Sequence, residues 1–500
     1  MHSLFARAGR AAAWAAAAKW FDMLGSLVTF LLMVRLLGPQ SFGLYGMALL
    51  AILLPETVVA GALSEGLIQR RELRPGHVAG AFLLQLVLSL VLLGALLVAS
   101  PWLAGRFGHV ELRLLIPLMA FTLLPLALGA VPTALLQREL RFKAIAAVDA
   151  AGALSAAVVG IGLALAGFGV WALAWMEVAR RVVRAAGFIA ASGWRPSFRA
   201  SASDVTELAS YNLMTLGTRL LTQADQAVPR LVVSMVLGAQ ALGYFNMAWR
   251  IYQQATAVII APFNAVALPV AASAQNDRAQ LHAALGGATG FAALIAYPAF
   301  IGAAAVAPSA IPLLLGASWA PAVPTVQLMM LMGVRAATAS FNGGVLRGGG
   351  RPGLQMATVA CGLGLSTVLS PLAAQWGLTA IAAVVLVRGL ATWALGAWFV
   401  EKSAGYPARL QILVGWQSLA AAAVMAAAVI SARPVLAGVL SDWRLLLALV
   451  AIGAVTHVAV LAALSPALAR RGAQIGLALM RRDRSRVSAL VRDAWAARQA

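Results

Sequence analysis

Residues 36–48 read LLGPQSFGLYGMA, and residues 236–248 read VLGAQALGYFNMA. The two stretches lie 200 residues apart and share Leu, Gly, Gln, Gly, Met and Ala at equivalent places. Gly38 and Gly238 can end a helix in a left-handed conformation, and Gly43 and Gly243 allow the next helix to start close by. The repetition therefore predicts the same helix–turn–helix element in two halves of the chain.

The composition is that of a membrane protein, because 62% of the 500 residues are hydrophobic and only 11% are charged. Apolar runs of about 20 residues, enough to cross a hydrocarbon core of roughly 30 Å, recur along the chain. We predict an all-α polytopic membrane protein with about 14 transmembrane helices, or 12 if two closely spaced pairs merge. The expected spans are residues 12–35, 43–64, 79–104, 112–136, 144–166, 169–191, 209–236, 243–268, 283–308, 320–345, 354–373, 377–400, 411–432 and 445–466.

Two further stretches repeat in the same order. LLQRELRF at 135–142 corresponds to VLRGGGRP at 345–352, and GVWALAWMEVAR at 169–180 corresponds to GLTAIAAVVLVR at 377–388. This series predicts two six-helix lobes in parallel orientation around a central cavity, the architecture of an alternating-access carrier. The expected domains are an N-terminal lobe (1–200), a C-terminal lobe (201–408), two additional transmembrane helices (409–466) and a basic cytoplasmic tail (467–500).

The net charge of +21 reflects the orientation of the protein in the membrane rather than binding to nucleic acid, because the basic residues lie at the ends of the expected spans. With the N-terminus in the cytoplasm, the inside loops carry most of the Arg and Lys, as the positive-inside rule requires. Both termini are then cytoplasmic. No cleavable signal peptide is evident, and the basic tail is either an orientation anchor or a lipid sensor.

Residues for enzyme chemistry are scarce. The single cysteine, Cys361, excludes an intrachain disulfide, and the sequence has no HExxH, GxxxxGK or GxSxG motif. We therefore expect no cofactor, no metal and no catalytic residue. A membrane-embedded glycosyltransferase or polymerase is disfavoured because the outside loops are short.

Charged side chains within the spans are the candidate functional residues, since ionisable groups at membrane depth mark a pathway or a partner. One face of span 209–236, an arc of about 80°, carries polar and cationic side chains. A surplus of arginine in a cavity predicts an anionic ligand, because arginine binds phosphate-like oxygens specifically. The expected cationic, substrate-binding residues are Arg180, Asn212, Arg219, Gln226, Arg230, Arg250, Arg335 and Arg388.

The buried acids have two possible roles. Asp22, Glu56 and Asp225 are candidates for ion coupling, and they are equally suited to neutralise nearby arginines. Glu177 and Arg181, four residues apart on one expected helix, form a plausible ion pair that would make this arginine structural.

Four stretches together carry a family resemblance: the two turns, ALSEGLIQRREL at 62–73 and GASWAPAVPTVQLMML at 316–331. They resemble the bacterial polysaccharide flippase family of the multidrug/oligosaccharidyl-lipid/polysaccharide exporter superfamily. The pattern covers nearly the whole chain and is strongest at the LG-x(4)-G-x-Y turn; the second turn departs slightly, with its aromatic residues at Tyr244 and Phe245.

The resemblance implies a function. Members move an undecaprenyl-diphosphate-linked oligosaccharide across the bacterial inner membrane for exopolysaccharide, capsule or O-antigen (lipopolysaccharide) assembly. Expected partners are this anionic lipid-linked substrate, membrane lipids, and a polysaccharide polymerase and co-polymerase, with the protein as a monomer. Two alternatives stay open: a flippase for the peptidoglycan precursor, and a multidrug antiporter of the same superfamily, whose cationic drugs would require an acidic cavity.

Overall fold

The computed structural model describes residues 2–61, 67, 73–197, 202–260, 278–348, 351–467 and 470. The chain divides into two compact units, Met1–Asn246 and Met247–Ala500. Throughout the described residues the regular structure is helical, as the apolar runs predict.

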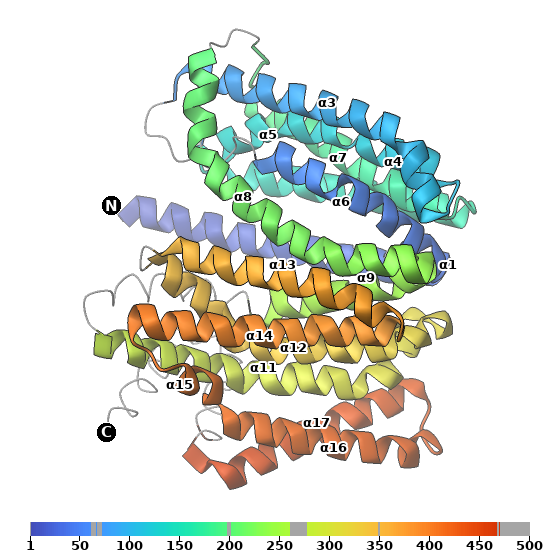
Figure 1. Cartoon of the computed structure of the whole chain (residues 1–500), viewed down its shortest axis with the longest axis vertical. Helices are drawn as coiled ribbons and strands as arrows, with labels where there is room; N and C mark the ends of the chain where they lie inside the picture. Colours follow the sequence, from blue (N-terminus) through green and yellow to red (C-terminus); the bar gives the residue numbers. More distant parts are fainter. Residues whose placement is uncertain are drawn as a thin grey trace. The chain divides into compact units, whose positions relative to one another are not determined.

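Figure 1 shows the helices. Unit 1 contains α1 (His2–Gly61), α3 (Pro75–Phe107), α4 (Leu112–Ala120), α5 (Leu123–Arg138), α6 (Phe142–Leu165), α7 (Val170–Ser192), α8 (Ala202–Val232) and η1 (Val233–Leu237). The helix α9 (Gly238–Ile259) continues from unit 1 into unit 2. Unit 2 further contains α11 (Arg278–Leu315), η2 (Ala317–Ala322), α12 (Val323–Gly348), α13 (Pro352–Ala374), α14 (Leu378–Ala404), α15 (Ala408–Leu413), α16 (Trp416–Ala437) and α17 (Asp442–Leu464).

The first turn of the repeat lies inside α1. This helix has 60 residues, and a straight helix of that length would measure roughly 90 Å, three times the thickness of the hydrocarbon core. Gly38 interrupts it, with φ 69° and ψ 175°, and Pro39 follows. The two arms of α1 therefore correspond to the first two expected spans.

The second turn has the same conformation. Gly238 has φ 81° and ψ −175° and joins η1, a π-helical segment, to α9. Positive φ at both glycines was predicted, but the extended ψ differs from that of a left-handed helical cap. It lies in a region of φ/ψ space that is essentially restricted to glycine.

Eleven helical segments of the described chain are long and apolar enough to span a membrane. Two of them, Gly25–Gly61 and Leu216–Ile259, contain the Gly38 and Gly238 bends. The first is part of the 60-residue α1 and the second has 44 residues, so α1 and Leu216–Ile259 each have room for two crossings. The charged helix α7 is not among the eleven. The count of 14 differs from 11 for these reasons and stays a prediction.

Each unit has its own packing. In unit 1, α7 packs against α5 and α6, and α8 packs against α1 and α3. In unit 2, α14 packs against α12 and α13, while α16 and α17 pack against each other and against α11 (Figure 1). Along the sequence, unit 1 ends at Asn246 and unit 2 begins at Met247. The helix α8 packs with α1 and α3 of unit 1. The domain limits expected from the repeat stay a prediction.

We expect Gly38→Ala to destabilise the protein, because a Cβ is strained at φ 69° although nothing lies within 4 Å of it. The cost should be about 1–3 kcal/mol. The measurement is the thermal unfolding midpoint of the purified protein in detergent. Gly94→Ala is the matched control, because Gly94 lies within α3 with no atom within 4 Å and no positive φ. Equal midpoints for the two variants would contradict the assignment of the bend to Gly38.

Candidate functional site

A cluster of charged side chains lies along one face of α7. Glu177, Arg180, Arg181 and Arg184 recur at the spacing that places side chains on one side of a helix. Glu177, only 5% exposed, accepts a hydrogen bond from Nε of Arg181 at 2.7 Å and another from Arg180. The predicted pair of Glu177 and Arg181 is confirmed.

The same cluster ties α7 to two other helices of unit 1. Arg181 donates from Nη2 to Oε1 of Glu56 on α1 at 2.7 Å. Nε of Arg184 lies 2.8 Å from Oδ1 of Asp149 on α6. Gly152 on α6 makes room for this pair, because a Cβ there would meet Cγ of Arg184 at 2.5 Å. The arginines of α7 are therefore matched by acids, and the pairs hold α1, α6 and α7 together.

Unit 2 brings two other predicted arginines together. Arg388 on α14 is 5% exposed and donates from Nη1 to Oγ of Ser366 on α13 at 3.2 Å. Arg335 on α12 lies against the next residue of α14, since a Cβ at Gly389 would be 2.8 Å from Nε of Arg335. The side chain of Arg335 therefore contacts α14 at Gly389, the residue next to Arg388, whose own guanidinium reaches α13.

Acids are scarce in this part of the sequence. Residues 226–400 contain seven arginines and no lysine, and their only acid is Asp277, which lies outside the described residues. The next acid along α14 is Glu401, 13 residues and roughly 20 Å from Arg388; its carboxylate accepts the backbone N–H of Ala408 at 2.9 Å. Arginine binds phosphate-like oxygens specifically, so Arg335 and Arg388 stay predicted anion-binding residues.

The remaining candidates lie on α1, α8 and α9. On α8, Gln226, Arg230 and Asp225 are half-buried, and Arg219 is exposed, with its Cδ 3.9 Å from the place of a Cβ at Gly61. Arg250 on α9 is exposed. Asp22 on α1 and Asn212 on α8 have side chains outside the described ones. A shared ligand for these residues stays a prediction.

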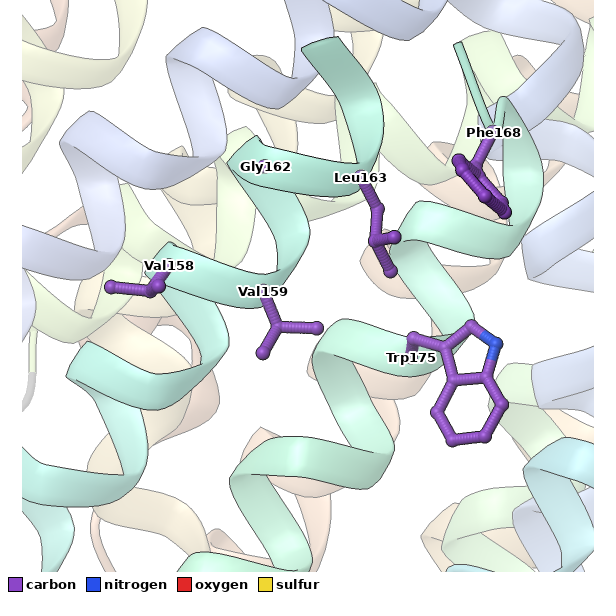
Figure 2. A pocket seen from close by; sticks show the side chains of 6 residues that line it. All are labelled: Val158, Val159, Gly162, Leu163, Phe168 and Trp175. Atoms are coloured by element: carbon purple, nitrogen blue, oxygen red, sulfur yellow. The ribbon is translucent and has the colours of Figure 1, made fainter. Parts of the chain in front are cut away.

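An apolar depression lies between α6 and α7 (Figure 2). It has a volume of about 430 Å³ and is lined by Val158, Val159, Gly162, Leu163, Phe168 and Trp175. Such a surface suits contact with an acyl chain, and it offers no charged group to an anion.

A profile of the family described as "Polysaccharide biosynthesis protein" matches residues 32–324, more than half of the chain. The chain belongs to this family. Curated proteins are similar to this chain over much of its length. The succinoglycan biosynthesis transport protein ExoT of Rhizobium meliloti is 28% identical over 305 residues, 61% of this chain. The chain spans 62% of the length of ExoT, less than two thirds.

Two further relatives match longer parts of the chain. The teichuronic acid biosynthesis protein TuaB of Bacillus subtilis is 24% identical, covering 71% of this chain and 73% of TuaB. The lipopolysaccharide biosynthesis protein WzxC of Escherichia coli is 22% identical, covering 67% of this chain and 68% of WzxC.

Solved structures share the fold. The lipid II flippase MurJ, in an inward closed conformation, aligns with a TM-score of 0.72 at 13% identity, covering 91% of this chain and 99% of MurJ. An inward-facing multidrug resistance MATE family transporter aligns with a TM-score of 0.62 at 15% identity, covering 77% and 94%. These confirm a polytopic membrane protein with the predicted all-α fold. At such identities they indicate the fold alone.

Sequence reasoning did not single out Ser366 or Gly389. Arg388 was found because it is charged within an apolar span, whereas a serine or a glycine is common in such spans. Neither carries a signal until α12 and α13 are known to pack against α14.

We expect Arg181→Ala to destabilise the protein strongly, because it leaves Glu56 and the buried Glu177 without their shared cation. Removing one partner of a buried pair costs about 3–5 kcal/mol. The measurement is the unfolding midpoint in detergent. Arg180→Ala is the control: Arg180 is 45% exposed and Glu177 keeps Arg181, so the decrease should be smaller. Similar midpoints for Arg181→Ala and the wild type would refute a structural role for the cluster.

Proposed function

We propose that this protein is a transporter that flips an anionic, undecaprenyl-diphosphate-linked oligosaccharide across the bacterial inner membrane for assembly of a surface polysaccharide. The family and the relatives named for succinoglycan, teichuronic acid and lipopolysaccharide biosynthesis support this proposal. The proposed function is transport and contains no enzymatic reaction. Both termini lie in the cytoplasm, in line with the distribution of Arg and Lys along the sequence.

The observation that carries the proposal is the match to the polysaccharide biosynthesis protein family over residues 32–324. Arg335 and Arg388 are the proposed diphosphate-binding residues, and Arg335 packs against Gly389, the residue next to Arg388 on α14. A diphosphate offers several oxygens for charge-assisted hydrogen bonds and fits two guanidinium groups better than a cationic drug does.

In the proposed mechanism the two lobes of the repeat rock about a substrate site. The site opens to the cytoplasm, Arg219, Arg335 and Arg388 attract the diphosphate, and rocking exposes it on the other side. Arg230, Arg250, Asn212 and Gln226 are proposed to line the same path, whereas Arg180, which donates to Glu177, is assigned to the structural cluster of α7. The polyprenyl chain would stay in lipid, and the polymerase and co-polymerase would receive the product.

The acidic residues within the expected spans are the candidates for binding a coupling ion. Glu56 lies within hydrogen-bonding distance of Arg181, so a role as a charge partner accounts for it. Asp22 and Asp225 are the remaining proposed sites for a coupling proton or sodium ion.

The rival functions differ in what they require. A multidrug antiporter needs acids near its cationic ligand, and the scarcity of acids from residue 226 to 400 disfavours it. A peptidoglycan-precursor flippase also carries a diphosphate lipid, so arginines do not exclude it. Deletion of the gene in its host separates these functions. Loss of surface polysaccharide, with repeat units kept on the cytoplasmic leaflet, supports the proposal. Arrested cell-wall synthesis or changed drug tolerance contradicts it.

We expect Arg335→Ala and Arg388→Ala each to lower polymer export in a complemented deletion strain by about 10-fold to 100-fold, since a hydrogen bond to a charged group contributes about 1.5–3 kcal/mol. Protein abundance should be unchanged. Arg433→Ala is the matched control, an exposed arginine on α16 that bonds to Ser309. Normal export by the Arg335→Ala/Arg388→Ala double variant would overturn the assignment of this pair.

The same assay tests the face of α8. Arg219→Ala should abolish export while leaving abundance unchanged, because its guanidinium is proposed to face the substrate. Export at the wild-type level would remove Arg219 from the site and leave Arg335 on α12 and Arg388 on α14 as the anion-binding residues.

A further inference from the structure

Leu140 has a backbone conformation that favours glycine. Among the residues that the structure describes, it is the one residue other than glycine with a positive φ, at 56°. Helices α3, α7 and α14 also end in this left-handed region, and there the residues are Gly108, Gly193 and Gly405. A bulky side chain is strained in this conformation. A leucine at this position therefore needs a reason other than the backbone.

The end of α5 imposes the conformation. The N–H of Leu140 donates to the carbonyl oxygen of Gln137 at 3.1 Å, and the N–H of Arg141 donates to that of Leu136 at 2.9 Å. These are the two hydrogen bonds of a Schellman motif, in which the residue with positive φ is usually glycine. The two bonds therefore hold residue 140 in the left-handed region.

The corresponding turn in the second half of the chain has a glycine. Residues 345–352 are the repeat of residues 135–142. The N–H of Arg351 donates to the carbonyl oxygen of Leu346 at 2.9 Å, as in the first half, and the residue before Arg351 is Gly350. A glycine thus accompanies this hydrogen bond in one half, and a leucine stands in its place in the other.

The side chain of Leu140 has little contact with the protein to offset the strain. It is 69% exposed, and the nearby Phe142 is 40% exposed. Arg141 and Lys143 are exposed beside them. Residues 138–143 contain three basic residues and one acid. This turn therefore presents two apolar side chains among basic ones.

The place of the turn in the chain indicates what it contacts. It joins Leu112–Arg138 to Phe142–Leu165, two segments that are long and apolar enough to span a membrane, so it lies at a membrane surface. By the positive-inside rule this surface faces the cytoplasm, where anionic lipids attract basic residues. Apolar side chains beside Arg and Lys at this depth enter the boundary between headgroups and acyl chains.

We infer that the turn at residues 138–143 binds anionic phospholipids of the cytoplasmic leaflet. Leu140 and Phe142 insert at the boundary of the acyl chains, and Arg141 and Lys143 lie on the phosphate groups. Burial of the Leu140 side chain in lipid offsets the strain of its backbone. This binding is independent of the transport function and requires only that the turn faces the cytoplasm.

Replacing Leu140 separates the strain from the lipid contact. We expect Leu140→Gly to raise the unfolding midpoint of the purified protein in a neutral detergent by about 2–4 °C, because it relieves the strain. In vesicles, adding phosphatidylglycerol to phosphatidylcholine should raise the midpoint of the wild type, because a ligand of the folded state stabilises it. This lipid-dependent rise should be roughly halved in Leu140→Gly, which keeps the charges of the turn and loses its apolar contact.

The matched control is another exposed apolar residue in a turn. Val110, between α3 and α4, is 75% exposed and has no positive φ. Val110→Gly should therefore leave the midpoint in detergent no higher than that of the wild type and keep the full lipid-dependent rise. Leu140→Asn is a second test variant and should behave as Leu140→Gly does, because asparagine adopts the left-handed conformation more readily than leucine.

A spin label measures the insertion directly. In a Cys361→Ser background, Leu140→Cys and Glu139→Cys each provide one site for a nitroxide label. In vesicles that contain phosphatidylglycerol, the label at residue 140 should collide with oxygen dissolved in the lipid more often than with a water-soluble nickel complex. The label at residue 139 should show the reverse, because Glu139 is a charged residue whose side chain is 58% exposed.

Each outcome decides the lipid site. A midpoint of Leu140→Gly below that of the wild type in detergent would overturn it, because the leucine would then be packed against the protein. An undiminished lipid-dependent rise in Leu140→Gly would also overturn it. A label at residue 140 that meets the nickel complex as often as the label at residue 139 would instead indicate a turn exposed to a cytoplasmic protein. A higher midpoint in detergent, a smaller lipid-dependent rise and a label in lipid together support the site.

Discussion

An arginine within a membrane-spanning helix must have its charge compensated, and this constraint orders the whole chain. The α7 arginines meet it with acids: Glu177, Glu56 and Asp149 bind them and fasten α7 to α1 and α6. Arg388 donates to the hydroxyl of Ser366, and Arg335 packs against Gly389, next to Arg388 on α14. We interpret the α7 pairs as structural and propose Arg335 and Arg388 as the anion-binding residues.

The repeated turns, at residues 36–48 and 236–248, are the second feature on which the fold depends. Glycines at 38 and 238 bend the chain through a conformation that other residues avoid, and glycines at 43 and 243 let the bent segments touch. A duplicated sequence thereby produces a duplicated surface, and two copies of one surface pair with each other most simply about a two-fold axis.

The sequence predicted what depends on local spacing. Apolar runs gave the helices, the turns gave the bends, and the four-residue interval between Glu177 and Arg181 gave their ion pair. It did not predict the extended ψ at Gly38, the approach of Gly43 to Ala239 or the packing of Arg335 against Gly389. Those features depend on which helices become neighbours, and a glycine needed for such an approach has the same sequence signature as one in any other turn.

The central claim is that Arg335 and Arg388 bind the anionic group of a lipid-linked oligosaccharide during its movement between leaflets. The most direct measurement is translocation of a purified undecaprenyl-diphosphate-linked oligosaccharide in vesicles that contain the purified protein, scored by the fraction accessible from outside. The account predicts that the wild type and Arg433→Ala move the lipid, and that the Arg335→Ala/Arg388→Ala protein does not. Translocation by the double variant at the wild-type rate would contradict the account.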